Sequence, residues 1–186
     1  MAVRSNAVVE SVPSVARKRP DCEFGNDLKT LFLRILKYPD KVVQGIDTAF
    51  YRLEPDREEQ ICETKLGNLK LELIAFREKA KTESNCRYVV QVLITSDEEF
   101  TKQQERALES YQLYLFDYNK DEVSRPDSFS VDADFPNQAF AEIDIDTRYK
   151  RPSDQVIKAI PADIAQGEGF LLPFVMHKGN PIKVKA

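Results

Sequence analysis

The chain has 186 residues, of which 42% are hydrophobic and 31% are charged, and its formal net charge is −4. A chain of this length can bury enough apolar surface to fold without a disulfide or a metal ion. Its mild acidity argues against a dedicated polyanion-binding protein, because such proteins are normally basic.

The cysteines and the hydropathy pattern indicate a cytoplasmic protein. Cys22, Cys62 and Cys86 are odd in number, widely spaced and without a C-x-x-C pattern, so neither a disulfide framework nor a zinc cluster is predicted. No apolar run approaches the ~20 residues of a membrane span, and the N-terminal residues lack the apolar core of a signal peptide. We therefore expect a soluble protein of a reducing compartment, without a membrane partner.

Residues 1–21 are predicted to form a flexible tail, and residues 22–186 a single α+β domain. The tail lacks the periodic apolar residues that would anchor it to a core. It carries the basic run Arg17, Lys18 and Arg19. We interpret this run as part of a solvated linker, and the alternative is a docking point for nucleic acid or an acidic partner.

Two helices are predicted after the tail. Asn26 and Asp27 precede the first helix. Its apolar residues have the spacing of one helical stripe: Leu28, Leu31, Phe32, Ile35 and Leu36. Pro39 ends this helix, because the residue before a proline is disfavoured in the α region, and Asp40 is expected to cap a short second helix.

Residues 56–81 fit two structures. Six apolar residues repeat in steps of three and four, as in an amphipathic helix: Cys62, Leu66, Leu69, Leu73, Phe76 and Ala80. The alternative is a β-hairpin with arms at residues 61–66 and 69–76 and a turn at Gly67-Asn68. Glycine costs about 1 kcal/mol in a helix interior, and a Gly-Asn pair between apolar arms is a good turn sequence, so we favour the hairpin.

Residues 87–95 are the strongest predicted strand. They are rich in β-branched residues and almost continuously apolar, as in a central strand that is covered on both faces. Ser96 and Glu99 have the spacing of a capping box, which predicts a helix over residues 96–111.

The rest of the chain is predicted to contain further strands and one short helix. The aromatic segment 111–118 is expected to be a strand, and residues 139–149 alternate apolar and polar side chains most clearly. Residues 154–160 are predicted to form a short helix and residues 170–176 a short strand. The expected fold is α+β, with a mainly antiparallel sheet of about five strands packed against one or two helices.

The most distinctive polar group is a row of carboxylates on the alternating strand. Glu142, Asp144 and Asp146 occupy every second position, so they share one face of the strand at a spacing of about 7 Å. Asp132 and Asp134 are expected on an adjacent strand. Such a cluster is costly unless water, a cation or the basic surface of a partner compensates it. A solvated strand face is the simplest interpretation of the cluster by itself, ahead of a partner-binding patch and of a metal site.

The surrounding segment is both acidic and aromatic. Nine acidic and only two basic side chains lie between residues 117 and 146, and Tyr114 and Tyr118 lie on the predicted strand at residues 111–118. Stacking platforms for single-stranded nucleic acid are aromatic but basic, so protein contact is the better interpretation of this combination. We expect a protein partner or self-association at a surface that contains these tyrosines and carboxylates.

An enzyme is the alternative hypothesis. Glu142, Asp144 and Asp146 would then hold Mg²⁺ or Ca²⁺ in a hydrolase. The sequence contains neither an EF-hand pattern nor a glycine-rich nucleotide-binding pattern, and no cofactor is predicted. His177 is the only histidine, which excludes a multi-histidine metal site, and no neighbouring residue indicates an activated cysteine for a Cys–His pair.

The sequence therefore predicts a non-enzymatic binding or assembly module, an accessory or structural subunit that binds a protein or forms oligomers. A divalent-metal-dependent hydrolase is the second hypothesis. The third is a nucleic-acid-associated protein that uses the basic run at residues 17–19 together with Lys178, Lys183 and Lys185.

Overall fold

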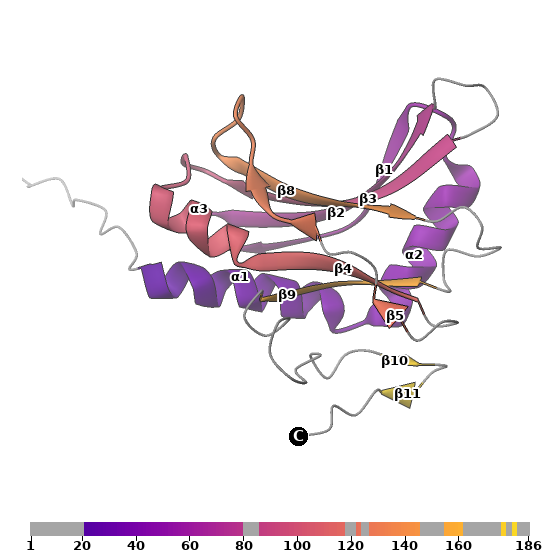
Figure 1. Ribbon diagram of the computed structural model, residues 1–186, viewed down its shortest axis with the longest axis horizontal. Helices are drawn as coiled ribbons and strands as arrows, with labels where there is room; N and C mark the ends of the chain where they lie inside the picture. The colour runs from indigo at the N-terminus through magenta and orange to yellow at the C-terminus, as the bar shows by residue number, and fades with distance from the viewer. Residues whose placement is uncertain are drawn as a thin grey trace, which may run out of the picture.

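Helices and antiparallel sheets build the described part of the chain (Figure 1). The computed structural model describes residues 21–79, 86–117, 122–123, 127–145, 155–161, 176–177 and 180–181. The α+β fold class and the mainly antiparallel sheet of about five strands are confirmed, and a second sheet that the sequence did not predict lies beside the first.

The two N-terminal helices are longer than predicted. α1 (Asp21–Leu36) begins ahead of Asn26, whose carbonyl already accepts a hydrogen bond from the Thr30 hydroxyl at 2.8 Å within the helix. α2 (Pro39–Arg52) begins at Pro39, which suits a first turn because it has no N–H to leave unpaired. The prediction that Asp40 caps α2 was wrong, since the residue at the N-cap is Tyr38 and it makes no side-chain capping bond.

Of the two structures predicted for residues 56–81, the hairpin forms, over residues 57–79. β1 (Arg57–Leu66) and β2 (Leu69–Lys79) pair in antiparallel register, with Leu66 opposite Leu69. Gly67 has a φ of 60°, a left-handed conformation that glycine adopts without steric cost. Local turn chemistry therefore outweighs the helical spacing of the apolar residues.

β3 (Cys86–Ser96) is the central strand, as predicted, and pairs with β2 on one side and β8 (Gln138–Ile145) on the other. The predicted start of the next helix at Ser96 was wrong. Ser96 is still part of β3, and its N–H donates to the Asn137 carbonyl at 2.9 Å. α3 (Lys102–Glu109) starts later, at a capping box formed by Thr101 and Gln104.

The second sheet is built around β4 (Tyr111–Asp117). One edge of β4 pairs with β9 (Gln155–Pro161), and the other edge pairs with β5 (Glu122–Val123) and β6 (Asp127–Ser128). The short helix predicted at residues 154–160 was wrong, since residues 155–160 belong to β9. The edge of β4 gives them hydrogen-bond partners that are distant in sequence, and sequence periodicity does not reveal such partners.

A single buried residue links the two sheets. β7 (Ser130–Val131) pairs with β8 and completes the order β1-β2-β3-β8-β7, whereas β6 belongs to the other sheet. Between them lies Phe129, which is 1% exposed and whose N–H donates to the Tyr111 carbonyl at 3.3 Å. The chain thus passes from one sheet to the other within residues 127–131.

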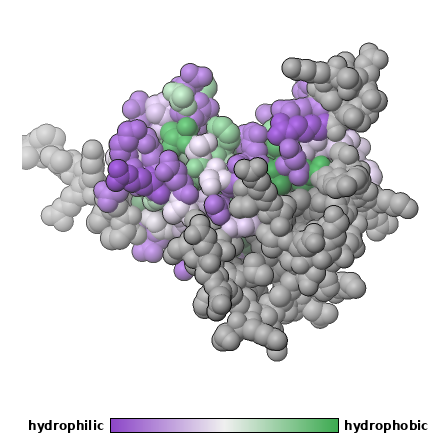
Figure 2. Space-filling view, viewed as in Figure 1, coloured by the Kyte–Doolittle hydropathy of each residue, from purple (hydrophilic) through white to green (hydrophobic). Residues whose placement is uncertain are grey.

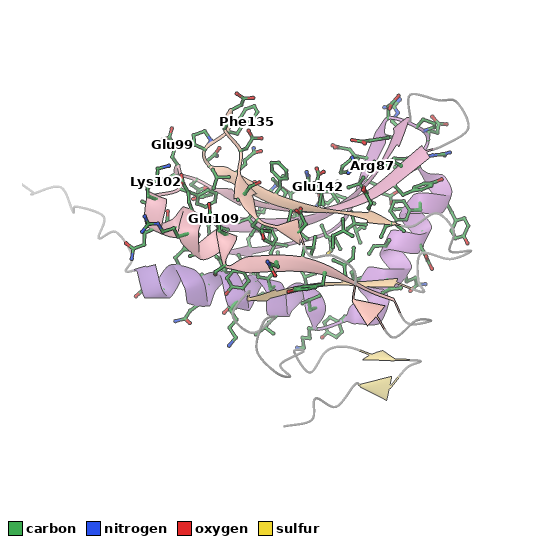
Figure 3. All side chains as sticks on the ribbon, in the orientation of Figure 1. Arg87, Glu99, Lys102, Glu109, Phe135 and Glu142 are labelled. Carbon is green, nitrogen blue, oxygen red and sulfur yellow. The ribbon has the colours of Figure 1, made fainter. Side chains whose placement is uncertain are left out.

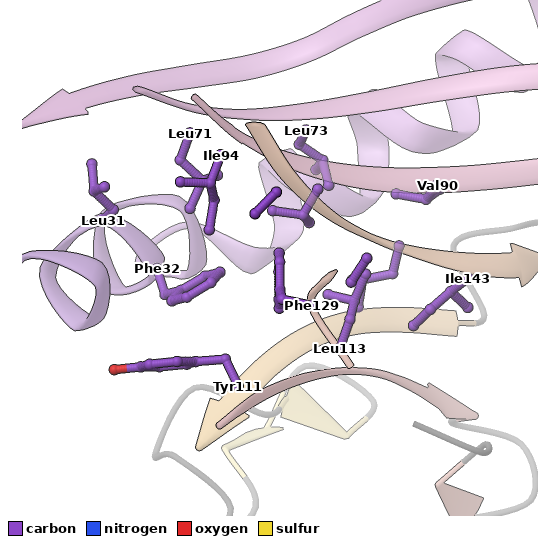
Figure 4. Packing of buried hydrophobic residues seen from close by; sticks show 14 of the residues in the cluster. Leu31, Phe32, Leu71, Leu73, Val90, Ile94, Tyr111, Leu113, Phe129 and Ile143 are labelled. Atoms are coloured by element: carbon purple, nitrogen blue, oxygen red, sulfur yellow. The ribbon is translucent and has the colours of Figure 1, made fainter. Parts of the chain in front are cut away.

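The core lies between the sheets and α1 (Figure 4). The ring of Phe32 from α1 stacks on Tyr111 with centroids 5.0 Å apart and lies 5.5 Å from the ring of Phe129. The inward side chains of the five-stranded sheet complete the core: Leu69, Leu71, Leu73, Ala75, Val90, Val92, Ile94, Ala139, Ala141, Ile143 and Ile145. The core thus fixes which face of that sheet points away from it.

Three further parts of the prediction fall partly or wholly outside the described residues. Residues 1–20 of the predicted tail and residues 146–149 of the alternating strand lie outside them. Of the strand predicted at residues 170–176 only Met176 is described, in β10 (Met176–His177), which pairs with β11 (Asn180–Pro181). No helix in the described ranges has the length and apolarity needed to cross a membrane.

Candidate functional site

The candidate site is the face of the five-stranded sheet that points away from the core, here called the open face. α1 lies on the opposite side of this sheet, the side of β4 and β9 (Figure 1). Alternate residues of each strand reach the open face, because successive side chains of a strand point to opposite sides. The register places Phe76 of β2, Val89 of β3 and Asp144 of β8 side by side on it.

The floor of the open face is apolar. Phe76 pairs with Val89 across β2 and β3, and Leu93 pairs with Phe140 across β3 and β8. Val89 is fully buried yet does not belong to the core cluster, whereas Phe76, Leu93 and Phe140 are half-buried, as is Ile74. In the space-filling view, hydrophobic side chains lie in the hollow between two hydrophilic ends (Figure 2).

Arg87 organises the charges at one end of the open face. Its Nε donates to Oδ1 of Asp144 at 2.5 Å, and its Nη1 donates to Oε2 of Glu78 at 2.8 Å. The hydrogen bonds to Asp144 and then to Glu78 raise the pKa of the Arg87 guanidinium, against a smaller opposing effect of desolvation. The side chains of Arg87 and Asp144 are 45% and 62% exposed, so the network remains accessible from solvent.

Glu142 lies on β8 at the border of the open face and is held by two neighbours. Its Oε1 accepts a hydrogen bond from Gln91 Nε2 at 2.9 Å, directly across β3 and β8. Its backbone N–H donates to Oδ2 of Asp127 at 2.7 Å, so this carboxylate takes the place of a strand partner at the edge of β8. Both contacts fix the orientation of Glu142 along the face.

Lys70 supplies a positive charge at the opposite end of the open face. Its Nζ lies 2.7 Å from Oε2 of Glu72, two residues along β2. The hydrogen bond to Glu72 is the largest of the effects that raise the pKa of Lys70. The two ends of the face therefore each contain a compensated ion pair, and the apolar floor lies between them.

Asp132 and Asp134 lie on the loop between β7 and β8 and not on a strand, which corrects the expectation of an adjacent strand. Oδ1 of Asp132 accepts a hydrogen bond from the Asp134 N–H at 2.8 Å, a local turn contact that competes with strand pairing. Phe135 follows on the same loop, is 56% exposed, and projects at the end of the sheet opposite Arg87 (Figure 3).

The structure separates Tyr114 from the carboxylates. Tyr114 is 9% exposed on β4, burial raises its pKa, and its hydroxyl donates to Oε1 of Gln112 at 2.8 Å. Tyr118 and Asp146 lie outside the described residues. Of the predicted site residues, Glu142 and Asp144 are on the open face, and Asp132 and Asp134 are on the loop beside it.

A shallow groove of about 370 Å³ opens where β1 begins. It contains three acidic and two basic side chains around an aromatic ring and an amide: Asp56, Glu58, Glu78, Arg57, Arg77, Phe76 and Gln91. Glu58, Phe76, Glu78 and Gln91 all belong to the open face, so the groove extends the apolar floor towards the start of β1.

The described residues contain no group of three His, Cys, Asp or Glu side chains that could hold a metal ion. Glu142 and Asp144 are hydrogen-bonded to Gln91 and Arg87, so a cation would have to displace these contacts. Cys62 is half-buried in β1, and burial raises the pKa of its thiol to about 11, the opposite of an activated thiolate.

Sequence reasoning missed residues that supply the apolar floor of the open face and the hydrogen-bond partners of its carboxylates. Arg87 was treated only as the start of a strand, and Gln91, Phe76 and Leu93 were not assigned to a site, whereas Phe140 was counted with the aromatic residues of the expected contact region. Their alternation along β2 and β3 was visible, but the register that brings them beside Glu142 and Asp144 depends on pairing across the sheet.

Comparison of the chain with protein-family models, curated proteins and solved structures finds no match.

Proposed function

We propose that this chain is a non-enzymatic binding or assembly subunit that contacts a protein partner through the open face of its five-stranded sheet. The observation that carries the proposal is the half-buried apolar floor formed by Phe76, Leu93 and Phe140 between charged ends. Protein interfaces have this composition, with aromatic and apolar residues in the middle and a polar, solvated rim.

The carboxylates fit the rim of an interface better than a reaction centre. Asp144 is bound by Arg87, and Glu142 is bound by Gln91, so each is oriented along the face by a partner from β3. Charged groups placed in this way steer a partner and select its register more than they add affinity.

The charge of the open face indicates a basic partner. Among the described residues, six acidic side chains and three basic ones belong to this face, which leaves an excess of three negative charges: Glu58, Glu63, Glu72, Glu78, Glu142 and Asp144 against Lys65, Lys70 and Arg87. A complementary surface would carry lysine or arginine around an apolar or aromatic anchor, since positive and negative potentials match across interfaces.

A photo-cross-linking amino acid at Leu93, in the floor of the open face, tests this function. The matched control has the same amino acid at Glu109, an exposed position on α3 (Figure 3). We expect an adduct from position 93 whose cross-linked peptide, identified by mass spectrometry, is basic. The adduct should be absent from position 109 and should disappear when Phe140→Asp is added.

Equal adducts at both positions, or an adduct at position 93 that survives Phe140→Asp, would show that the open face is not the contact surface. Phe140 is half-buried, so the folded state of the variant is verified by its thermal unfolding midpoint. Phe140→Gln, which removes the apolar ring without adding a charge, is the second variant if Phe140→Asp does not fold.

A further inference from the structure

A basic and aromatic cluster lies where α1 meets α2. Tyr38 is 53% exposed, and the Nζ atoms of Lys37 and Lys41 lie 5.5 Å and 5.0 Å from the centre of its ring. Both lysines are exposed, and no ion pair within the described residues engages either of them. Lys37, Tyr38 and Lys41 are here called the basic corner.

The basic corner faces away from the open face of its own chain. It joins α1 and α2, which pack through Phe32 and Phe50 against the core side of the sheets. The apolar floor of Leu93 and Phe140 lies on the other side of the five-stranded sheet. Contact between the two surfaces therefore requires two molecules.

The two surfaces match in chemistry. The basic corner presents an aromatic ring between two ammonium groups, and the open face presents an apolar floor between carboxylates. Tyrosine is a frequent interface anchor because it buries a large area and keeps a hydroxyl for hydrogen bonding. Glu58 of β1 and Glu142 of β8 lie on the open face on either side of Phe76 and Gln91.

We propose that the partner of the open face is a second copy of this chain, which inserts the basic corner formed by Lys37, Tyr38 and Lys41. This inference rests on the proposed binding function of the open face. Because the contact joins two different surfaces, it is heterologous, and it generates a ring if the rotation closes and a linear chain if it does not.

Analytical ultracentrifugation of the full chain tests the inference first. The average molecular mass is expected to rise with protein concentration and to exceed the mass of two copies. Each bound copy still offers one free surface to the next copy. High salt is expected to reverse the association, since it screens the charges of exposed surfaces. Lys37→Glu/Lys41→Glu should weaken self-association about tenfold or more, by reversing both charges that face the carboxylates.

Mixing two variants tests whether the contact joins the open face of one copy to the basic corner of another. Glu58→Lys/Glu142→Lys alters the open face and leaves the basic corner intact, whereas Lys37→Glu/Lys41→Glu does the reverse. Each variant alone is expected to be a monomer. An equimolar mixture is expected to associate again, because the intact corner matches the intact open face and the two charge-reversed surfaces match each other. A single chain carrying all four substitutions should associate again, because both surfaces have exchanged their charges.

A wild-type chain that stays monomeric at every concentration would overturn the inference, and so would a mixture in which the two variants form no complex. The control Gln44→Glu/Thr48→Glu adds two negative charges to exposed positions of α2 outside the basic corner and should leave association unchanged. If the wild type is monomeric while the Leu93 cross-linker still captures a basic foreign protein, only the identity of the partner is wrong. If both experiments fail, the proposed function itself is wrong.

Discussion

Arg87 on β3 and Asp144 on β8 are 57 residues apart in sequence and joined by a hydrogen bond of 2.5 Å on the open face. Arg87 also binds Glu78 on β2, so one guanidinium links three strands. Arg87 therefore compensates two of the negative charges at this end of the sheet. Repulsion between Asp144 and Glu78 is relieved by this shared guanidinium.

Removing Arg87 should destabilise the protein modestly. The side chains of Arg87 and Asp144 are 45% and 62% exposed, and ion pairs of this exposure are worth about 0.5 kcal/mol each, so Arg87→Gln should lower the free energy of unfolding by about 1 kcal/mol. Urea unfolding of Arg87→Gln, Asp144→Asn and the double variant measures the coupling. The coupling should shrink in high salt, and a coupling of zero at low salt would contradict the observed pairing.

Divalent cations should not stabilise this chain through Glu142 and Asp144. Both carboxylates already accept hydrogen bonds, from Gln91 and Arg87, so a cation must break these contacts before it can bind. Millimolar Mg²⁺ or Ca²⁺ is expected to shift the thermal midpoint no more than a monovalent salt of equal ionic strength. A larger shift that disappears in Asp144→Asn would support the metal-dependent hydrolase instead.

Two helical glycines should respond in opposite directions to alanine. A Cβ at Gly25 in α1 meets no atom within 4 Å, so Gly25→Ala should raise the free energy of unfolding by about 0.5–1 kcal/mol through helix propensity. A Cβ at Gly45 in α2 would lie 2.6 Å from Cγ2 of Ile61, so Gly45→Ala should lower it.

Thermal or urea unfolding of the two variants checks this pair. Adding Ile61→Leu, which removes the branch at Cβ, should recover part of the loss in Gly45→Ala. If the two alanine variants have equal stability, the close approach of α2 to β1 is not as described.

The thiol of Cys62 should react slowly in the folded protein. Burial raises its pKa from 9.0 to about 11, so at pH 8 the thiolate fraction is roughly 100-fold smaller than in the unfolded chain. Iodoacetamide alkylation, followed by mass spectrometry in a Cys22→Ser/Cys86→Ser background, should accelerate about tenfold per pH unit between pH 9 and pH 11.

The same shift has a consequence for stability. Between pH 9 and pH 11 the folded protein keeps the Cys62 proton while the unfolded chain loses it, so the free energy of unfolding should fall as the pH rises through this window. Cys62→Ala should remove this dependence. Alkylation of the native protein at pH 8 as fast as that of the urea-unfolded protein would contradict the burial of Cys62.

Local chemistry allowed the sequence to predict several elements. The hairpin at residues 57–79 follows from a Gly-Asn turn between apolar arms, and β3 follows from its β-branched apolar run. The outward orientation of Glu142 and Asp144 follows from the alternation of β8, because a buried apolar face fixes which side chains point away from the core. These features need only the neighbours of each residue in the chain.

Tertiary structure decided the features that depend on partners far away in sequence. Residues 155–161 form a strand because β4 offers them an edge, and Ser96 remains in β3 because Asn137 receives its N–H. Arg87 meets Asp144, and Leu93 meets Phe140, only after β3 and β8 have paired in one register. The sequence alone determined the row of acids, whereas the apolar floor and its charge compensation arise from hydrogen-bonded pairing between strands, which no local pattern encodes.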